Sequence, residues 1–102
     1  MFAVIYRWRV KPEKEQQFIE AWTEITKYYL TTFGALGSRL HRGSDGIFYA
    51  YAQWKFAENR TEAFQNAPKF EAGIKLKEAI IEILPEIRLE PLSDLLIFPN
   101  KK

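Results

Sequence analysis

The sequence predicts one α+β domain with elements in the order β-α-β-β-α-β and a four-stranded antiparallel sheet. Three observations lead to this fold class: a two-residue apolar period at the amino terminus, a longer apolar period just after it, and an Asp-Gly reversal between two later strand-like segments. A chain of 102 residues can bury one core but hardly two. We therefore expect a single domain over residues 1–102, with any function inside it or at an interface.

The first strand is predicted over residues 2–10, where large apolar side chains alternate as on a strand with one buried face. One side carries Phe2, Val4, Tyr6, Trp8 and Val10, and the other carries Ala3, Ile5, Arg7 and Arg9. From residue 13 to about residue 32 the apolar side chains recur every third or fourth position, which is typical of an amphipathic helix. These positions are Phe18, Trp22, Ile25, Tyr29 and Phe33. Pro12 suits the first turn of that helix.

Two strands are predicted over residues 36–42 and 47–54, after Gly34 and Gly37 end the helix. The Asp45-Gly46 pair between them readily takes the positive φ angles of a tight reversal. The two strands therefore form a hairpin.

The last third of the chain predicts more helix and then a strand. Residues 58–66 form a short helix, and Pro68 begins a longer one that Pro85 ends. Its apolar positions are Phe70, Ile74, Leu76, Ile80 and Leu84. A fourth extended segment is expected over residues 87–98, where Pro91 permits only an edge, a bulge or a break. This element order is that of the ferredoxin-like fold.

The two faces of the predicted sheet differ in character. In the third strand Phe48, Ala50, Ala52 and Trp54 share the side where helices can pack, while Ile47, Tyr49, Tyr51 and Gln53 share the other. The second side also receives Ile5, Arg7, Arg9, Arg39 and His41. Such a face is too apolar to stay in water and too charged for an ordinary core, so we expect a second copy to cover it and a homodimer to form.

Composition excludes several kinds of site. Without cysteine there is no disulfide, thiolate nucleophile or zinc–sulfur centre, and a single histidine allows no multi-histidine metal cluster, so no metal is expected. The 15 basic and 13 acidic residues are scattered, so no nucleic-acid surface is expected. Arg7 interrupts the apolar residues at the amino terminus, so this segment has the pattern of neither a signal peptide nor a membrane span. We therefore expect a cytoplasmic protein.

Four segments resemble the antibiotic biosynthesis monooxygenase family and its dimeric α/β-barrel relatives. They are residues 4–12, 18–22 and 34–42 and the run Tyr51-Ala52-Gln53-Trp54, and the resemblance extends over roughly residues 2–80. It implies that two sheets face each other in a dimeric α/β barrel, with small pockets between each sheet and its helices. The family includes oxygenases of polycyclic aromatic compounds, quinol oxygenases, haem-degrading enzymes and signal-processing proteins.

The residues disfavour haem degradation. The haem-degrading branch uses an Asn in the first strand and a Trp and a His around the second helical region. The matching positions here are Tyr6, Phe64 and Ile74, so no proximal iron ligand remains.

The resemblance also implies oxygenation without metal, flavin or other cofactor, on a small aromatic, polyphenolic or quinol-type compound. Such a reaction needs an apolar pocket, a base, and donors or cations that stabilise the substrate anion. His41 is the expected base because its ordinary pKa is closest to neutrality, and Arg39 and Tyr6 are the expected polar partners. The expected pocket walls are Trp8, Trp22, Phe48, Tyr51, Trp54, Phe64 and Phe70.

A simpler interpretation stays open for each of these residues. His41 could be a strand residue satisfied by backbone or dimer contacts, and Trp22 could belong to an ordinary core. The strand arginines could pair with carboxylates such as Glu90 or Asp94. The whole protein could then be a non-catalytic dimeric module that binds a small apolar ligand or serves as a scaffold.

Overall fold

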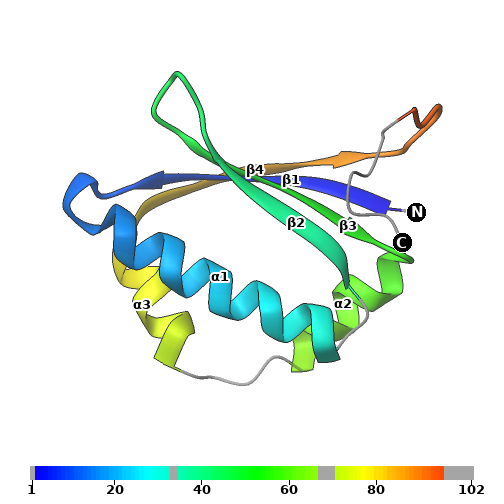
Figure 1. The fold of residues 1–102 in the computed structure, drawn as a ribbon, viewed down its shortest axis with the longest axis horizontal. Helices are drawn as coiled ribbons and strands as arrows, with labels where there is room; N and C mark the ends of the chain where they lie inside the picture. Colours follow the sequence, from blue (N-terminus) through cyan, green and yellow to red (C-terminus); the bar gives the residue numbers. More distant parts are fainter. Residues whose placement is uncertain (1, 33–34, 67–70, 96–102) are drawn as a thin grey trace.

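The computed structural model describes residues 2–32, 35–66 and 71–95 and has the predicted α+β order (Figure 1). The elements are β1 (Phe2–Val10), a short 3-10 turn η1 (Pro12–Lys14), α1 (Glu15–Thr32), β2 (Ala35–Arg42), β3 (Phe48–Trp54), α2 (Ala57–Asn66), α3 (Glu71–Ala79) and β4 (Ile80–Leu89). The ferredoxin-like prediction is therefore confirmed, with the second helical region split into two helices.

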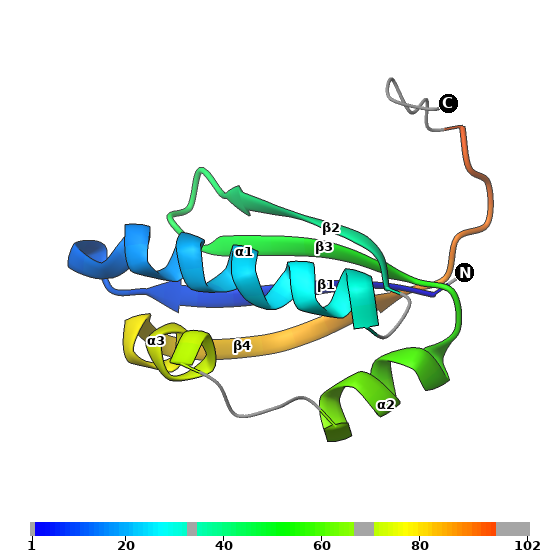
Figure 2. The same ribbon diagram turned by 60° about the horizontal axis from the view of Figure 1, so that its bottom comes forward.

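The strands form one antiparallel sheet in the order β2-β3-β1-β4. All three α-helices lie on the same side of this sheet, and its other side carries no helix (Figures 1 and 2). Ile5 pairs with Tyr51, which pairs on its other side with Arg39. Because paired residues point to the same face, the predicted grouping of Ile5, Tyr51 and Arg39 on one side of the sheet is confirmed.

The β2–β3 hairpin turns where the Asp-Gly pair predicts it. Gly46 donates its backbone N–H to the Gly43 carbonyl at 2.9 Å, and Gly43 donates to the Ile47 carbonyl at 2.7 Å. Of the pair, only Gly46 has a positive φ, +84°, and Asp45 instead accepts the Ile47 N–H through its side chain. The glycine supplies the left-handed conformation and the aspartate supplies an acceptor.

The predicted long helix ending at Pro85 is wrong in its second half. α3 ends at Ala79, and β4 occupies residues 80–89 instead of the expected 87–98; residues 90–95 are not strand, and Pro68, Phe70 and residues 96–98 lie outside the described residues. Pairing with β1 decides the outcome, because it satisfies the backbone of a segment rich in β-branched isoleucine. Pro85 is tolerated since β4 is an edge strand whose register shifts there.

The core lies between the sheet and α1. Phe18 is fully buried and makes edge-to-face contacts with Trp8 and Phe48, at centroid distances of 5.1 and 5.4 Å. These three rings fill the half of the domain nearest the start of α1. The other half, toward the end of α1, is less completely filled, and the cavity described below lies there.

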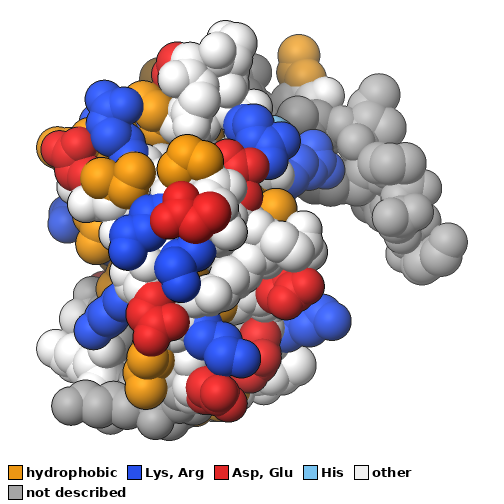
Figure 3. Space-filling view, turned by 90° about the vertical axis from the view of Figure 1, so that its left-hand side faces the viewer, with side chains coloured by type: hydrophobic (Ala, Val, Ile, Leu, Met, Phe, Trp, Pro, Cys, Tyr) orange, Lys and Arg blue, Asp and Glu red, His pale blue; other side chains and the backbone are white. Residues whose placement is uncertain are grey.

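Two properties of the surface bear on partners. Across the described parts of the chain, none of the helices combines the length and the apolar character needed to span a membrane. On the end of the molecule seen in Figure 3, Lys and Arg side chains are interspersed with Asp and Glu, so that face carries no continuous basic surface.

Candidate functional site

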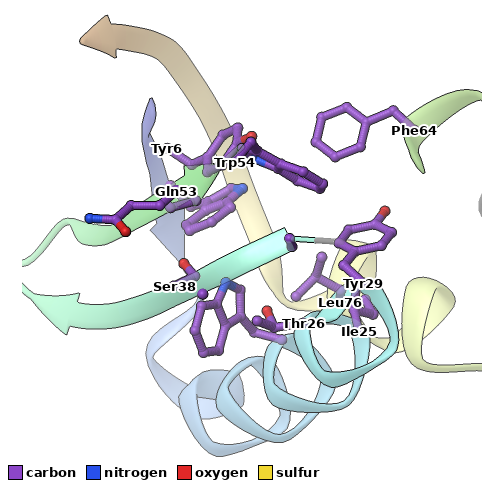
Figure 4. A pocket seen from close by; sticks show the side chains of 14 residues that line it. Tyr6, Ile25, Thr26, Tyr29, Ser38, Gln53, Trp54, Phe64 and Leu76 are labelled. Carbon is purple, nitrogen blue, oxygen red and sulfur yellow. The ribbon is translucent and has the colours of Figure 1, made fainter. Parts of the chain in front are cut away.

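A cavity of about 190 Å³ lies between the helix side of the sheet and α1 and α2. Figure 4 shows Tyr6 and Trp54 entering it from the sheet, Ile25 and Tyr29 from α1 and Phe64 from α2. Fourteen of the described residues line it: Tyr6, Trp8, Trp22, Ile25, Thr26, Tyr29, Ala35, Gly37, Ser38, Ala52, Gln53, Trp54, Phe64 and Leu76. The wall is largely aromatic, so the cavity suits a flat apolar ligand.

Five of the predicted site residues meet in this cavity, namely Tyr6, Trp8, Trp22, Trp54 and Phe64. Phe48 does not line it, because its ring is only 2% exposed and is packed in the core. Tyr51 alternates to the open side, where it borders a shallow depression next to residues 89–95. Phe70 lies outside the described residues.

His41 and Arg39 do not join Tyr6 in the cavity. Both are exposed on the open side of β2, where they pair with Tyr49 and Tyr51. Tyr6 pairs with Ala50 and faces the helices. The sheet thus separates the three residues predicted to act together, because residues of odd and even offset along paired strands point to opposite faces.

Tyr6 is instead linked to a charged group that the sequence did not indicate. Arg60 of α2 donates from Nη1 to the Tyr6 hydroxyl oxygen at 3.4 Å and to Glu86 Oε1 of β4 at 3.0 Å. Its guanidinium lies over the rings of Phe2 and Phe64, 5.5 and 5.3 Å from their centroids. Its side chain is only 12% exposed, so this cation is held in a largely apolar setting beside the cavity.

The electrostatics of this cluster keep Tyr6 neutral and Arg60 charged. Burial raises the pKa of Tyr6 above its ordinary value, although the hydrogen bond from Arg60 opposes the rise. Burial opposes the charge on Arg60, but its hydrogen bonds to Glu86 and Tyr6 outweigh that and raise the pKa of Arg60. The hydrogen bond from Arg60 lowers the pKa of Glu86, and one from Arg88 at 3.1 Å adds to the effect.

Trp54 contributes a second donor at the same point. Its indole N–H is buried without a hydrogen-bond partner among the described residues. It lies near enough to the Tyr6 oxygen to lower the pKa of Tyr6, yet the geometry falls outside that of a hydrogen bond. An unpaired buried donor of this kind is costly to the folded state.

Two of these residues were missed by sequence reasoning for different reasons. Arg60 precedes Phe64 by four residues, one helical turn, and this spacing was a usable signal that went unused. Glu86 was missed because the residues before it were predicted to be helical. That prediction gave no reason to expect β4 beside β1.

Comparison with known sequences decides the family. The sequence profile of the antibiotic biosynthesis monooxygenase family matches residues 1–76, which is most of the chain. The chain belongs to the antibiotic biosynthesis monooxygenase family. The resemblance stated from the sequence is therefore confirmed, whereas a search of curated proteins finds no match to the chain.

Several solved structures share the fold. SnoaB from Streptomyces nogalater, a cofactor-independent oxygenase solved as the mutant N63A, superimposes with a TM-score of 0.76 at 14% identity, over 92% of this chain and 95% of that one. Rv0793 from Mycobacterium tuberculosis gives 0.74 at 14% identity, over 93% and 98%. A conserved protein from Methanosarcina mazei gives 0.73 at 18% identity, over 86% and 89%. At these identities the likeness establishes the fold alone.

Proposed function

We propose that this family member oxygenates a small phenol or quinol in the cavity between the sheet and α1, without metal or flavin. The observation that carries the proposal is an aromatic cavity with Tyr6 in its wall and the Arg60 guanidinium bonded to the Tyr6 hydroxyl. A deprotonated phenol is electron-rich enough to pass one electron to O₂, and an apolar wall excludes the water that would quench the intermediates. SnoaB, which shares the fold, is a cofactor-independent oxygenase, and this supports the reaction class by analogy.

The reaction balances without an external reductant. The phenolate gives one electron to O₂, and the resulting radical and superoxide combine into a peroxide anion at a ring carbon that carries a hydrogen; the proton released when the phenol ionised converts this anion into a hydroperoxide. Loss of water from that group leaves a new carbonyl, so a phenol and O₂ become a quinone and water. Tyr6 would hold the substrate oxyanion by donating a hydrogen bond to it, which stabilises the charge before the electron leaves.

The size of the cavity narrows the substrate class. An engineered cavity of about 150 Å³ holds benzene, while drug-sized ligands fill about 300 Å³ or more. A volume of about 190 Å³ lies nearer the first value. We therefore expect phenols and quinols of one or two fused rings to fit better than larger polycyclic ones.

Oxygen uptake tests the proposal. Purified protein is given a panel of one-, two- and three-ring phenols and quinols, with heat-denatured protein as the control for spontaneous oxidation. We expect uptake above the control with the smaller members and entry of labelled oxygen into the quinone. Oxygen uptake equal to that of the control for every compound in the panel would reject the proposed oxygenase activity.

A non-catalytic ligand-binding module is the second candidate. It is favoured by the lining itself, because none of the fourteen described residues around the cavity is an Asp, Glu, His or Lys that could act as a base. This candidate predicts that the same compounds bind, for example by quenching Trp fluorescence, but undergo no turnover.

We also propose that the open side of the sheet pairs with a second copy. Ile87 and Leu89 of β4 point to that side and are 43% and 36% exposed, and partly buried Ile5 and Tyr51 adjoin them. Apolar area of this kind gains free energy when an identical face covers it. Light scattering at micromolar concentration tests this, and a clean monomer would reject it.

A further inference from the structure

The groups that donate to the Tyr6 hydroxyl oxygen provide no acceptor for the hydrogen of that hydroxyl. Two donor groups, the Arg60 guanidinium and the Trp54 indole, lower the pKa of Tyr6, and neither can accept a hydrogen bond. The oxygen therefore accepts from its neighbours, and the phenolic hydrogen is left to be donated elsewhere. Tyr6 lines the cavity, so the natural place for the missing acceptor is a ligand oxygen inside it.

The charges behind Tyr6 favour a negative acceptor over a neutral one. Arg60 and Arg88 share the single carboxylate of Glu86, at 3.0 and 3.1 Å. Two positive charges and one negative charge leave a net charge of +1 on this group. Because the Arg60 side chain is 12% exposed and lies near the rings of Phe2 and Phe64, water screens its charge less than that of Arg88, whose side chain is 67% exposed.

We propose that the cavity selects its ligand as an anion, binding the deprotonated oxygen of a phenol or enol at the Tyr6 hydroxyl with the positive charge of Arg60 behind it. This inference rests on the proposed function, since it describes how the same cavity would recognise its substrate. Arg60 is a positioning residue here, because it acts on the ligand through Tyr6 and through its charge. The ligand's proton goes to solvent on binding.

This selection removes the need for a base in the cavity. None of the described residues that line the cavity is an Asp, Glu, His or Lys, and His41 lies on the other side of the sheet. If the bound anion is stabilised, the pKa of the bound hydroxyl falls below that of the free compound, and ionisation at neutral pH follows from binding itself. Affinity then rises with pH between the bound and the free pKa values and levels off above the free value.

The experiment uses para-nitrophenol, a phenol whose yellow anion reports its ionisation and which needs no turnover to be seen. The bound probe is titrated spectroscopically with wild-type protein and with three variants. We expect wild type to lower the pKa of the bound probe by about 1, the size of effect that a nearby opposite charge produces. Arg60→Met should bring that pKa back near the free value, and Arg60→Lys should keep most of the lowering.

Glu86→Gln separates charge selection from a structural role. Both Arg60→Met and Glu86→Gln break the same ion pair, so a structural effect would move the two variants in the same direction. On our proposal they move the pKa of the probe in opposite directions, since Glu86→Gln raises the net positive charge near the cavity. Arg42→Met is the matched control, because Arg42 also pairs with a glutamate and lies 5.2 Å from the Phe48 ring centroid, but away from the cavity.

The outcomes distinguish this inference from the proposed function. Binding with an unshifted pKa in wild type, or shifts of the same sign in Arg60→Met and Glu86→Gln, would overturn anion selection and leave oxygenation standing. A lowered pKa without oxygen uptake from any panel compound would reject the oxygenase and retain an anion-selective binding site. Failure of every phenol to bind would reject both.

Discussion

The two sides of the sheet carry similar side chains and yet differ in what they can do. Each side of the sheet carries aromatic rings, a tyrosine hydroxyl and an arginine. On the helix side these groups are enclosed, so Tyr6 and Arg60 interact in a poorly screened setting around a cavity. On the open side Arg39 and His41 are exposed, and Tyr49 bonds to Asp45 at the hairpin. Enclosure, more than residue type, distinguishes a binding site from an interface.

The largest expected effect concerns packing on the helix side. Phe18→Ala removes a fully buried ring between Trp8 and Phe48, so we expect a loss of about 3–5 kcal/mol in the free energy of unfolding. Phe56→Ala, the same change at a ring that is 57% exposed, should cost less than about 1 kcal/mol. Urea denaturation measures both. Equal losses would mean that the core is not where the structure places it.

Tyr6→Phe tests which tyrosine hydroxyl belongs to the site. Removing one hydrogen-bond donor to a developing oxyanion lowers turnover on the order of 10²-fold. We expect a decrease of that size for Tyr6→Phe, because the variant loses the hydroxyl and keeps the ring. Tyr49→Phe is the matched variant on the open side and should leave turnover within about twofold, because its hydroxyl serves only the hairpin. Steady-state oxygen uptake measures both.

His41→Ala and Arg39→Ala examine the assignment that sequence alone favoured. If turnover fell 10²-fold in either variant while Tyr6→Phe kept the turnover of wild type, the residues that act on the substrate would lie on the open side of the sheet.

Ile87→Asp tests the open side as an interface. A carboxylate placed on that face would be buried without a partner in a dimer, so we expect the dimer dissociation constant to rise at least about tenfold. Ile83→Asp is the control on the same strand, because Ile83 pairs with Trp8 and points to the helix side, where it is 70% exposed. Sedimentation equilibrium compares the two, and equal effects would contradict the assigned interface.

The smallest expected effect is a pH dependence at the hairpin. The hydrogen bond from Tyr49, and then that from Ile47, lowers the pKa of Asp45, so its stabilising contribution is present above the ordinary aspartate range and is lost as pH falls through the lowered pKa. The same bond to Asp45 raises the pKa of Tyr49, so the contribution is also lost in strongly alkaline solution. The melting temperature of Asp45→Asn should therefore fall below that of wild type at pH 7 and converge with it in acid. A constant difference would show that the charge is irrelevant.

Local pattern predicted most of the fold, and pairing between distant segments decided the rest. The period of residues 2–10, the Asp-Gly hairpin and the division of faces all depend on neighbours in sequence. Ile80 and Leu84 fit a helical spacing equally well, and only pairing with β1 makes them a strand.

The site was predicted in part for the same reason. The aromatic walls follow from residue type and periodicity, so Trp8, Trp22, Trp54 and Phe64 were found. The Arg60–Glu86 contact joins α2 to β4 and could not be seen without the placement of both elements. His41 was chosen for its chemistry and was correctly expected on the open side with Tyr49, but the sequence did not indicate that the cavity lies on the other side of the sheet.

A structure with a bound, unreactive two-ring phenol tests the central claim most directly. The account predicts the ring in this cavity, against its aromatic wall, with its oxygen about 3 Å from the Tyr6 hydroxyl. A ligand found on the open side against Tyr51 and His41, with this cavity closed by its own side chains, would contradict it.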